Sequence, residues 1–133
     1  MLTAEQMNAN PLPFAKLMGV RFMTVSKEEV VAELMVREDL CTAPQQVLHG
    51  GAAMALADTV GAVATVVNLP EGAKGTTTIE SKTNFVSAAP VGGVVRATTT
   101  PIHRGNRTQV WQTRITRADG KLVAVITQTQ MVL

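Results

Sequence analysis

The sequence is poor in aromatic residues and in cysteine. Its 133 residues include one Trp, three Phe and no Tyr, so any core must be aliphatic. Few side chains could stack on nucleobases, and no run of Lys or Arg accompanies the net charge of +2, so we expect no nucleic-acid partner. Cys41 is the single cysteine, which excludes an intrachain disulfide and is typical of a reducing compartment.

Targeting signals and long hydrophobic runs are also scarce. The N-terminus lacks the basic start and continuous apolar run of a signal peptide. Ala52–Leu69 is the one stretch long enough to suggest a membrane span, but it contains Asp58, is rich in Ala and Thr, and has no flanking basic anchors. We therefore expect a buried core helix, no membrane partner and a cytoplasmic location.

The composition favours one folded domain over residues 1–133, because 46% of the residues are hydrophobic and 17% are charged. Period-2 alternation predicts strands in the second half, and Asp119-Gly120 predicts a two-residue hairpin turn. In order, we expect a short helix (14–18), a hairpin (20–25 and 30–36), a loop (38–48), a helix from Gly50 to before Pro70, and four strands (76–87, 94–103, 108–117 and 122–132).

These elements predict an α+β fold in which an antiparallel sheet covers one long helix, with the last four strands as a meander. The helix sequence is apolar nearly all round. A single sheet cannot bury every side of such a helix, so the pattern also favours a second subunit over the remaining face.

Asp58 is the only charged residue between Asp39 and Glu71. An ionised carboxylate in an apolar helix is costly without a partner, which favours a functional role. The alternative is a structural acid, either hydrogen-bonded across a subunit interface or facing solvent.

Gly50 and Gly51 open the same helix. Bare backbone N–H groups at a helix start suit a developing oxyanion, and a carboxylate beside them could act as base or nucleophile in acyl transfer. Eight residues of helix span about 12 Å, too far for Gly50 and Asp58 of one chain to hold the same carbonyl. We therefore expect a shared site, with Gly50 of one subunit facing Asp58 of its partner.

The remaining chemical groups allow two interpretations each. His49 is equally compatible with a helix-entry residue bonded to backbone and with a catalytic group. The turn at 104–108, Arg-Gly-Asn-Arg-Thr, is either an exposed hairpin turn or a clamp for phosphates. His49 and His103 have no metal-ligand spacing, so no metal is expected, and Cys41 has no recognisable catalytic partner.

Two segments carry a family resemblance. Residues 48–52, Leu-His-Gly-Gly-Ala, followed by Asp58, resemble the signature of hotdog-fold thioesterases, especially the phenylacetate-pathway and enterobactin-associated branch of acyl-CoA thioesterases. Residues 101–111 resemble that family's strand-turn-strand segment, and the similarity extends over roughly residues 14–133.

The resemblance implies a hotdog fold, an active dimer or dimer of dimers, and roles for individual residues. Asp58 falls on the catalytic acid, Gly50 on the oxyanion donor, His49 beside the thioester and Thr78 near a hydroxyl that places water or substrate. Ala43 stands where the family commonly has Asn or Gln, and Gln45 or Gln46 would substitute if the loop is shifted. Implied binding residues for substrate and coenzyme A are Gln46, Phe85, Val86, Ser87, Ala88, His103, Arg104, Gly105, Asn106 and Arg107.

The sequence thus predicts a thioesterase that hydrolyses an acyl- or aroyl-CoA at interfaces of a homo-oligomer. No separate cofactor is expected, since coenzyme A is part of the substrate. Two alternatives stay open at this point: a non-catalytic hotdog subunit that binds CoA esters, and a hotdog enoyl-CoA hydratase.

Overall fold

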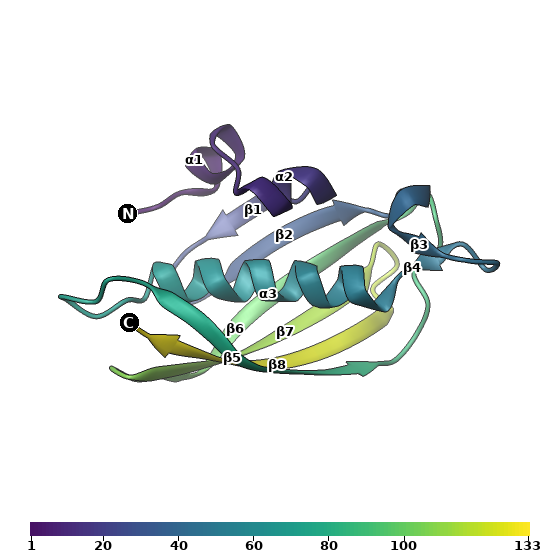
Figure 1. Ribbon diagram of the computed structural model, residues 1–133. Helices are drawn as coiled ribbons and strands as arrows, with labels where there is room; N and C mark the ends of the chain where they lie inside the picture. Colours follow the sequence, from purple (N-terminus) through teal and green to yellow (C-terminus); the bar gives the residue numbers. More distant parts are fainter.

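A computed structural model describes all residues, 1–133, as one central helix against a curved antiparallel sheet (Figure 1). The sheet has six strands in the order β1-β2-β6-β7-β8-β5. The elements are α1 (Ala4–Ala9), α2 (Pro13–Met18), β1 (Arg21–Val25), β2 (Val30–Met35), η1 (Glu38–Leu40), β3 (Cys41–Thr42), β4 (Val47–Leu48), α3 (Gly50–Val66), β5 (Thr76–Phe85), β6 (Val94–Arg104), β7 (Thr108–Arg117) and β8 (Leu122–Val132).

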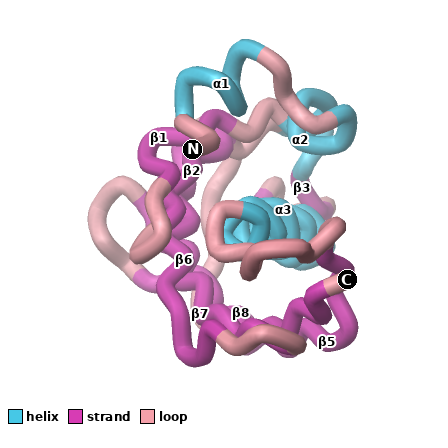
Figure 2. The backbone as a smooth tube through the Cα atoms, turned by 90° about the vertical axis from the view of Figure 1, so that its left-hand side faces the viewer, coloured by secondary structure: helices cyan, strands magenta, loops and turns pink.

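The core lies between α3 and the concave face of the sheet. Figure 2, seen along the helix, shows the sheet curving from β1 to β5 around α3, with α1 and α2 on the remaining upper side. The side chains that fill this space are aliphatic and small, as the low aromatic content requires. Leu56, Ala57 and Val60 of α3 are fully buried, as are Ile115 of β7 and Ile126 of β8.

The expected meander of four strands is wrong for β5. Strands β6, β7 and β8 do follow one another in the sheet, but β5 pairs with β8, and β6 pairs with β2. The chain after β5 runs past the start of α3, where Leu48 N donates to Ala89 O at 2.8 Å, and only then enters the sheet. Most side chains of β5 are exposed, which suits an edge strand and not the centre of the sheet.

One face of α3 is not covered within the chain. Its exposed residues Gly51, Met54, Asp58 and Val66 follow helical spacing, so they form one stripe. The sequence predicts a second subunit over the helix face that the sheet leaves uncovered, and this stripe is the surface on which it would pack. Asp58 itself is exposed in the single chain, so its environment is not the buried one that the sequence suggested.

Two local features differ from the sequence prediction. Helix α1 was not predicted, although Thr3 and Gln6 form a capping box at its start. The β7–β8 turn is longer than two residues: Arg117 N donates to Lys121 O, which leaves residues 118–120 as the loop. Gly120 alone takes a positive φ there, 86°, so Ala118 and Asp119 form a type I turn and Gly120 is the left-handed residue that follows it. No helix is long and apolar enough to span a bilayer.

Candidate active site

Asp58 is hydrogen-bonded to a strand rather than left alone on its helix. Thr78 of β5 donates from Oγ1 to Asp58 Oδ1 at 2.6 Å. Gln128 of β8 also directs its amide nitrogen at Oδ1, at a longer 3.4 Å. Both contacts fall on the same carboxylate oxygen, so Oδ2 makes no hydrogen bond within the chain.

The start of α3 presents an unpaired backbone donor. The Nδ1 atom of His49, the N-cap residue, accepts a hydrogen bond from Gly51 N at 2.8 Å. Gly50 N–H makes no hydrogen bond in the chain, and it is therefore the free donor at this helix end. Since Nδ1 accepts, neutral His49 carries its proton on Nε2, and its exposed side chain is a second potential donor nearby.

Phe85 lies directly over this helix start. A Cβ on Gly50 would be 3.0 Å from Phe85 Cε1, a distance that real side chains rarely tolerate. The absence of a side chain at position 50 therefore lets the aromatic ring of β5 approach the backbone closely. Phe85 is nevertheless 58% exposed, because its other face is open to solvent.

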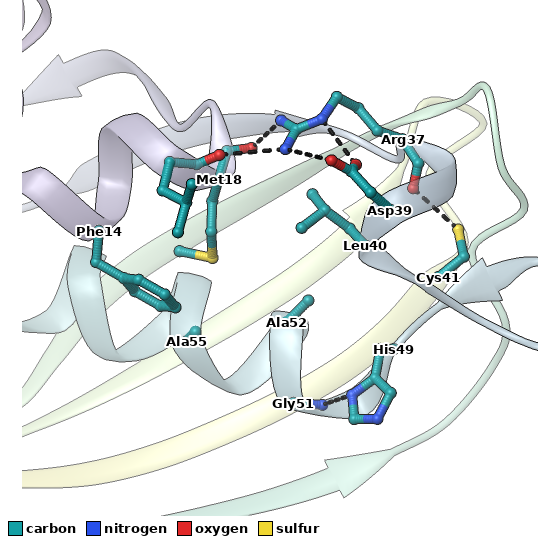
Figure 3. Close-up of a pocket in the computed structure, with 11 residues that line it drawn as sticks. Phe14, Met18, Arg37, Asp39, Leu40, Cys41, His49, Gly51, Ala52 and Ala55 are labelled. Atoms are coloured by element: carbon teal, nitrogen blue, oxygen red, sulfur yellow. Dashed lines mark hydrogen bonds and ion pairs between the residues drawn. The ribbon is translucent and has the colours of Figure 1, made fainter.

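A pocket of about 460 Å³ opens beside the helix start, between α2, the segment after β2 and the first turns of α3. Figure 3 shows side chains of α2 pointing toward Ala52 and Ala55 of α3, with His49 at the lower edge. Arg37 ties the pocket wall together, because its guanidinium donates to the carbonyls of Leu17 and Met18. Seven of the eleven lining residues are hydrophobic, and Phe14, Leu17, Met18 and Leu40 are the largest.

Comparison with known proteins identifies the family to which this chain belongs. Residues 45–124, which contain the helix start, Asp58 and Thr78, match the thioesterase superfamily. The chain belongs to that superfamily. Its fold is the hotdog fold and its chemistry is thioester hydrolysis, as the sequence predicted.

Individual relatives extend the similarity of this thioesterase over nearly its full length. It is 33% identical to the 1,4-dihydroxy-2-naphthoyl-CoA hydrolase of Escherichia coli over 125 residues, 91% of this chain and 88% of the relative. The structure of a mutant thioesterase from Pseudomonas aeruginosa superimposes with a TM-score of 0.91 at 29% identity, covering 100% of this chain and 95% of the other. A thioesterase from Haemophilus influenzae gives 0.90 at 28%, covering 100% and 92%.

Within one chain of this thioesterase, the residues named from the sequence fall into three groups. His49, Gly50 and Phe85 lie at the start of α3, and Asp58 and Thr78 lie near its middle. The β6–β7 turn lies at the opposite end of α3. Arg104, at the end of β6, donates to Lys27 O in the β1–β2 turn, and Asn68, just beyond the end of α3, donates to the same carbonyl. A single subunit therefore does not bring all the predicted groups together.

Several of the predicted binding residues have structural partners. Arg104 forms an ion pair with the exposed Glu28 at 3.0 Å, so its role as a phosphate clamp, which stays a prediction, would require this ion pair to open. Ser87 Oγ donates to Leu122 O at 2.5 Å, which holds the chain after β5 against β8. Gln46 lies in the exposed β3–β4 turn with φ 50°. Five of them are exposed and make no side-chain hydrogen bond, namely Val86, Ala88, His103, Asn106 and Arg107. Gly105 is half-buried under His103.

The polar residues beneath Asp58 were not predicted from the sequence. Gln128 and Gln130 are both 0% exposed on β8, on the face that points at α3. Alternation along 122–132 was itself a signal, because it places Ile126, Gln128 and Gln130 on one face. Polar residues on a face that is otherwise apolar indicate either a satisfied core network or a site.

Proposed function

We propose that this thioesterase hydrolyses acyl- or aroyl-CoA esters to the free acid and coenzyme A, with Asp58 as base or nucleophile. The observation that carries the proposal is the Asp58 carboxylate, anchored through Oδ1 by Thr78 while Oδ2 has no partner in the chain. An oriented carboxylate with one free oxygen suits either attack on a thioester carbonyl or removal of a proton from water. The thiolate of coenzyme A leaves readily, so no strong general acid is needed.

The second part of the proposal is a site shared by two subunits. Gly50 N–H is the free donor for the oxyanion, yet it lies about 12 Å along the helix from Asp58 of its own chain. The uncovered stripe of α3 contains Asp58, and the exposed edge strand β5 next to it carries Ile79 and Phe85, with Val86 directly after the strand. A second copy packed on this surface would bring its own Gly50 toward Asp58 and cover the apolar side chains.

We further propose that the pocket beside His49 receives the acyl group. It opens at the helix start, where the carbonyl would bind Gly50 N–H, and its lining is mainly apolar. A volume of about 460 Å³ suits an aromatic or a medium-length aliphatic group. The similarity to a naphthoyl-CoA hydrolase supports aromatic acyl groups as the first to test.

The experiment is a thiol-release assay of the purified protein over a panel of aroyl- and alkyl-CoA esters. We expect release of coenzyme A with at least one of them, and its loss in Asp58→Asn. Asp119→Asn is the matched control, because Asp119 is an exposed acid in the β7–β8 turn. If no ester releases thiol above background, the proposal is wrong. Loss of an enoyl-CoA double bond without thiol release would indicate a hydratase instead.

A further inference from the structure

A buried polar chain continues from Asp58 into the sheet. The Nε2 atom of Gln130 lies 2.6 Å from Thr78 Oγ1, and its Oε1 atom accepts a hydrogen bond from Thr76 Oγ1 at 3.0 Å. Gln130 is fully buried, and the strand register places it directly opposite Thr78. Both the oxygen and the nitrogen of its amide thus have a partner on the edge strand β5. The same strand donates a hydrogen bond to Asp58 of α3.

The chemistry of these groups fixes the direction of every hydrogen bond. The amide nitrogen of Gln130 can only donate, so Thr78 Oγ1 accepts from it. The single hydroxyl hydrogen of Thr78 is then left for Asp58 Oδ1, since an ionised carboxylate can only accept. A rotated amide would offer Thr78 a second acceptor and compete with Asp58 for that hydrogen. The donors therefore run one way, from Gln130 through Thr78 to Asp58.

This arrangement has a consequence for the two oxygens of Asp58. Thr78 and the more distant Gln128 both donate to Oδ1, so the carboxylate is held through one oxygen and the other is free. Without a hydroxyl hydrogen directed at it, the Asp58 carboxylate would be free to turn and neither oxygen would be held toward the substrate, so Thr78 must remain a committed donor. Gln130 keeps Thr78 in this donor role, because Thr78 Oγ1 accepts from the amide nitrogen of Gln130.

We propose that Gln130 is a positioning residue for thioester hydrolysis, which acts through Thr78 to hold Asp58 with Oδ2 presented to substrate or water. This inference rests on the function proposed above. Gln130 touches neither the carboxylate nor the pocket, so its effect passes entirely through the Thr78 hydroxyl. A purely structural Gln130 would contribute to stability alone, and the two roles give different results in the following experiment.

The first variant is Gln130→Met, which keeps the length of the side chain and removes both amide atoms. We expect kcat to fall about tenfold with little change in KM, the effect of losing one hydrogen bond to a charged group. Gln109→Met is the matched control. Gln109 is paired with Gln130 across β7 and β8 and is 1% exposed, but its amide donates to Asn68 O, away from Asp58. We expect Gln109→Met to lower Tm by a similar amount without changing kcat.

The decisive measurement is a double-mutant cycle with Thr78→Val. If Gln130 acts through Thr78, adding Gln130→Met to Thr78→Val costs no further activity. Additive losses in the cycle, or equal kcat losses for Gln130→Met and Gln109→Met, would overturn the inference. Should Gln130→Met not fold, Thr76→Val replaces it, since this half-buried change removes the hydroxyl that contacts Gln130 Oε1 and otherwise only the carbonyl of Met131. We expect a smaller kcat loss that again disappears in the Thr78→Val background.

A second readout separates this inference from the proposed function. The side-chain amide signals of Gln130 in a ¹H–¹⁵N spectrum should shift in Thr78→Val and in Asp58→Asn, while those of Gln109 should stay in place. This result does not depend on any substrate. An absence of thiol release by the wild-type protein would therefore contradict the proposed function alone. Unshifted Gln130 signals would contradict the inference about Gln130 even in an active enzyme.

Discussion

The carboxamide of Gln128 occupies the space where a side chain at Gly61 would begin. A Cβ on Gly61 would lie 2.4 Å from Gln128 Cδ and Oε1, and 2.6 Å from Nε2. Helix α3 therefore approaches β8 closely at this point, three residues beyond Asp58. Both residues are buried, so neither has room to move aside.

We expect Gly61→Ala to destabilise the protein, although alanine is the better helix former. Overpacking a core costs about 1–3 kcal/mol, which exceeds the gain of about 1 kcal/mol from helix propensity. Thermal unfolding would show the lower Tm. Gly75→Ala is the control, since a Cβ there meets nothing within 4 Å and Gly75 does not have a positive φ. An unchanged Tm for Gly61→Ala would contradict the close packing.

The proposed chemistry predicts a large kinetic effect at Asp58. We expect Asp58→Ala to lower kcat for the best CoA ester by about 10²-fold or more, the range for a lost base or nucleophile. Because Asp58 is exposed, Tm should change little. Activity that survives the substitution would show that another group performs the reaction.

Isotope labelling distinguishes the two roles of Asp58. In a single turnover in H₂¹⁸O, a general base delivers solvent oxygen directly to the acid product. A nucleophile first forms an anhydride through Oδ2, so attack of water at the Asp58 carbonyl leaves ¹⁸O in the protein and unlabelled oxygen in the product. Mass spectrometry of the peptide that contains Asp58 detects this label, and ¹⁸O in that peptide would identify Asp58 as the nucleophile.

Phe85 and Gly50 predict a coupled pair of substitutions. Gly50→Ala should lower kcat/KM, because the new methyl group displaces the Phe85 ring and crowds the free N–H. The same clash should lower the Tm of Gly50→Ala. Phe85→Ala in this background removes the clash, so we expect part of the lost Tm to return. The comparison requires Tm and kcat/KM for both single variants and the double variant. Purely additive effects of the two substitutions would show that there is no energetic coupling between positions 50 and 85.

The edge strand predicts the site of subunit contact. Ile79→Lys places a charge on the exposed side of β5, where we propose that a second copy packs, so we expect a smaller mass by light scattering and loss of activity. Ile102→Lys is the matched control, because Ile102 is similarly exposed, 58% against 53%, but lies on β6. An unchanged mass for Ile79→Lys would contradict the proposed interface.

The β7–β8 turn predicts a small dependence of stability on acid. Hydrogen bonds from the Arg117 guanidinium and the Lys121 amide hold the pKa of the Asp119 carboxyl below its ordinary value of 3.8. A lowered folded-state pKa stabilises the protein above the ordinary value, and the contribution is lost as pH falls through the folded-state pKa. Wild type should therefore be slightly more stable than Asp119→Asn at pH 6, and the two Tm values should converge on acidification. A difference that persists at the lowest pH would contradict this cause.

Local pattern was sufficient for most of the fold. Alternation located the strands of the second half, and Pro70 with Gly50 bracketed the long helix within a few residues. The partner of β5 was not predictable in this way, because pairing depends on where the connection after Phe85 runs, and that path is set by backbone contacts with Leu48 and Gln46.

The site was predictable to the extent that its residues belong to one motif. Asp58 stood out by charge alone, and the resemblance supplied Thr78, which the structure places 2.6 Å away. Alternation marks Gln130 only as a polar residue on an apolar face, since its link to Thr78 arises only when β8 pairs with β5 in this register. The ion pair between Arg104 and Glu28 could not be predicted from local pattern either, because the two residues are 76 positions apart in the sequence.

The hydrogen bond between Thr78 and Asp58 links α3 to the edge strand β5 of the sheet. An edge strand is among the first elements to open in local fluctuations, and β5 is held by β8 on one side only. A subunit that packed on β5 would restrain that opening as well as supply Gly50. Specific activity should then depend on enzyme concentration: on dilution, each separated subunit would lose the oxyanion donor and the rigidity of its carboxylate in the same event.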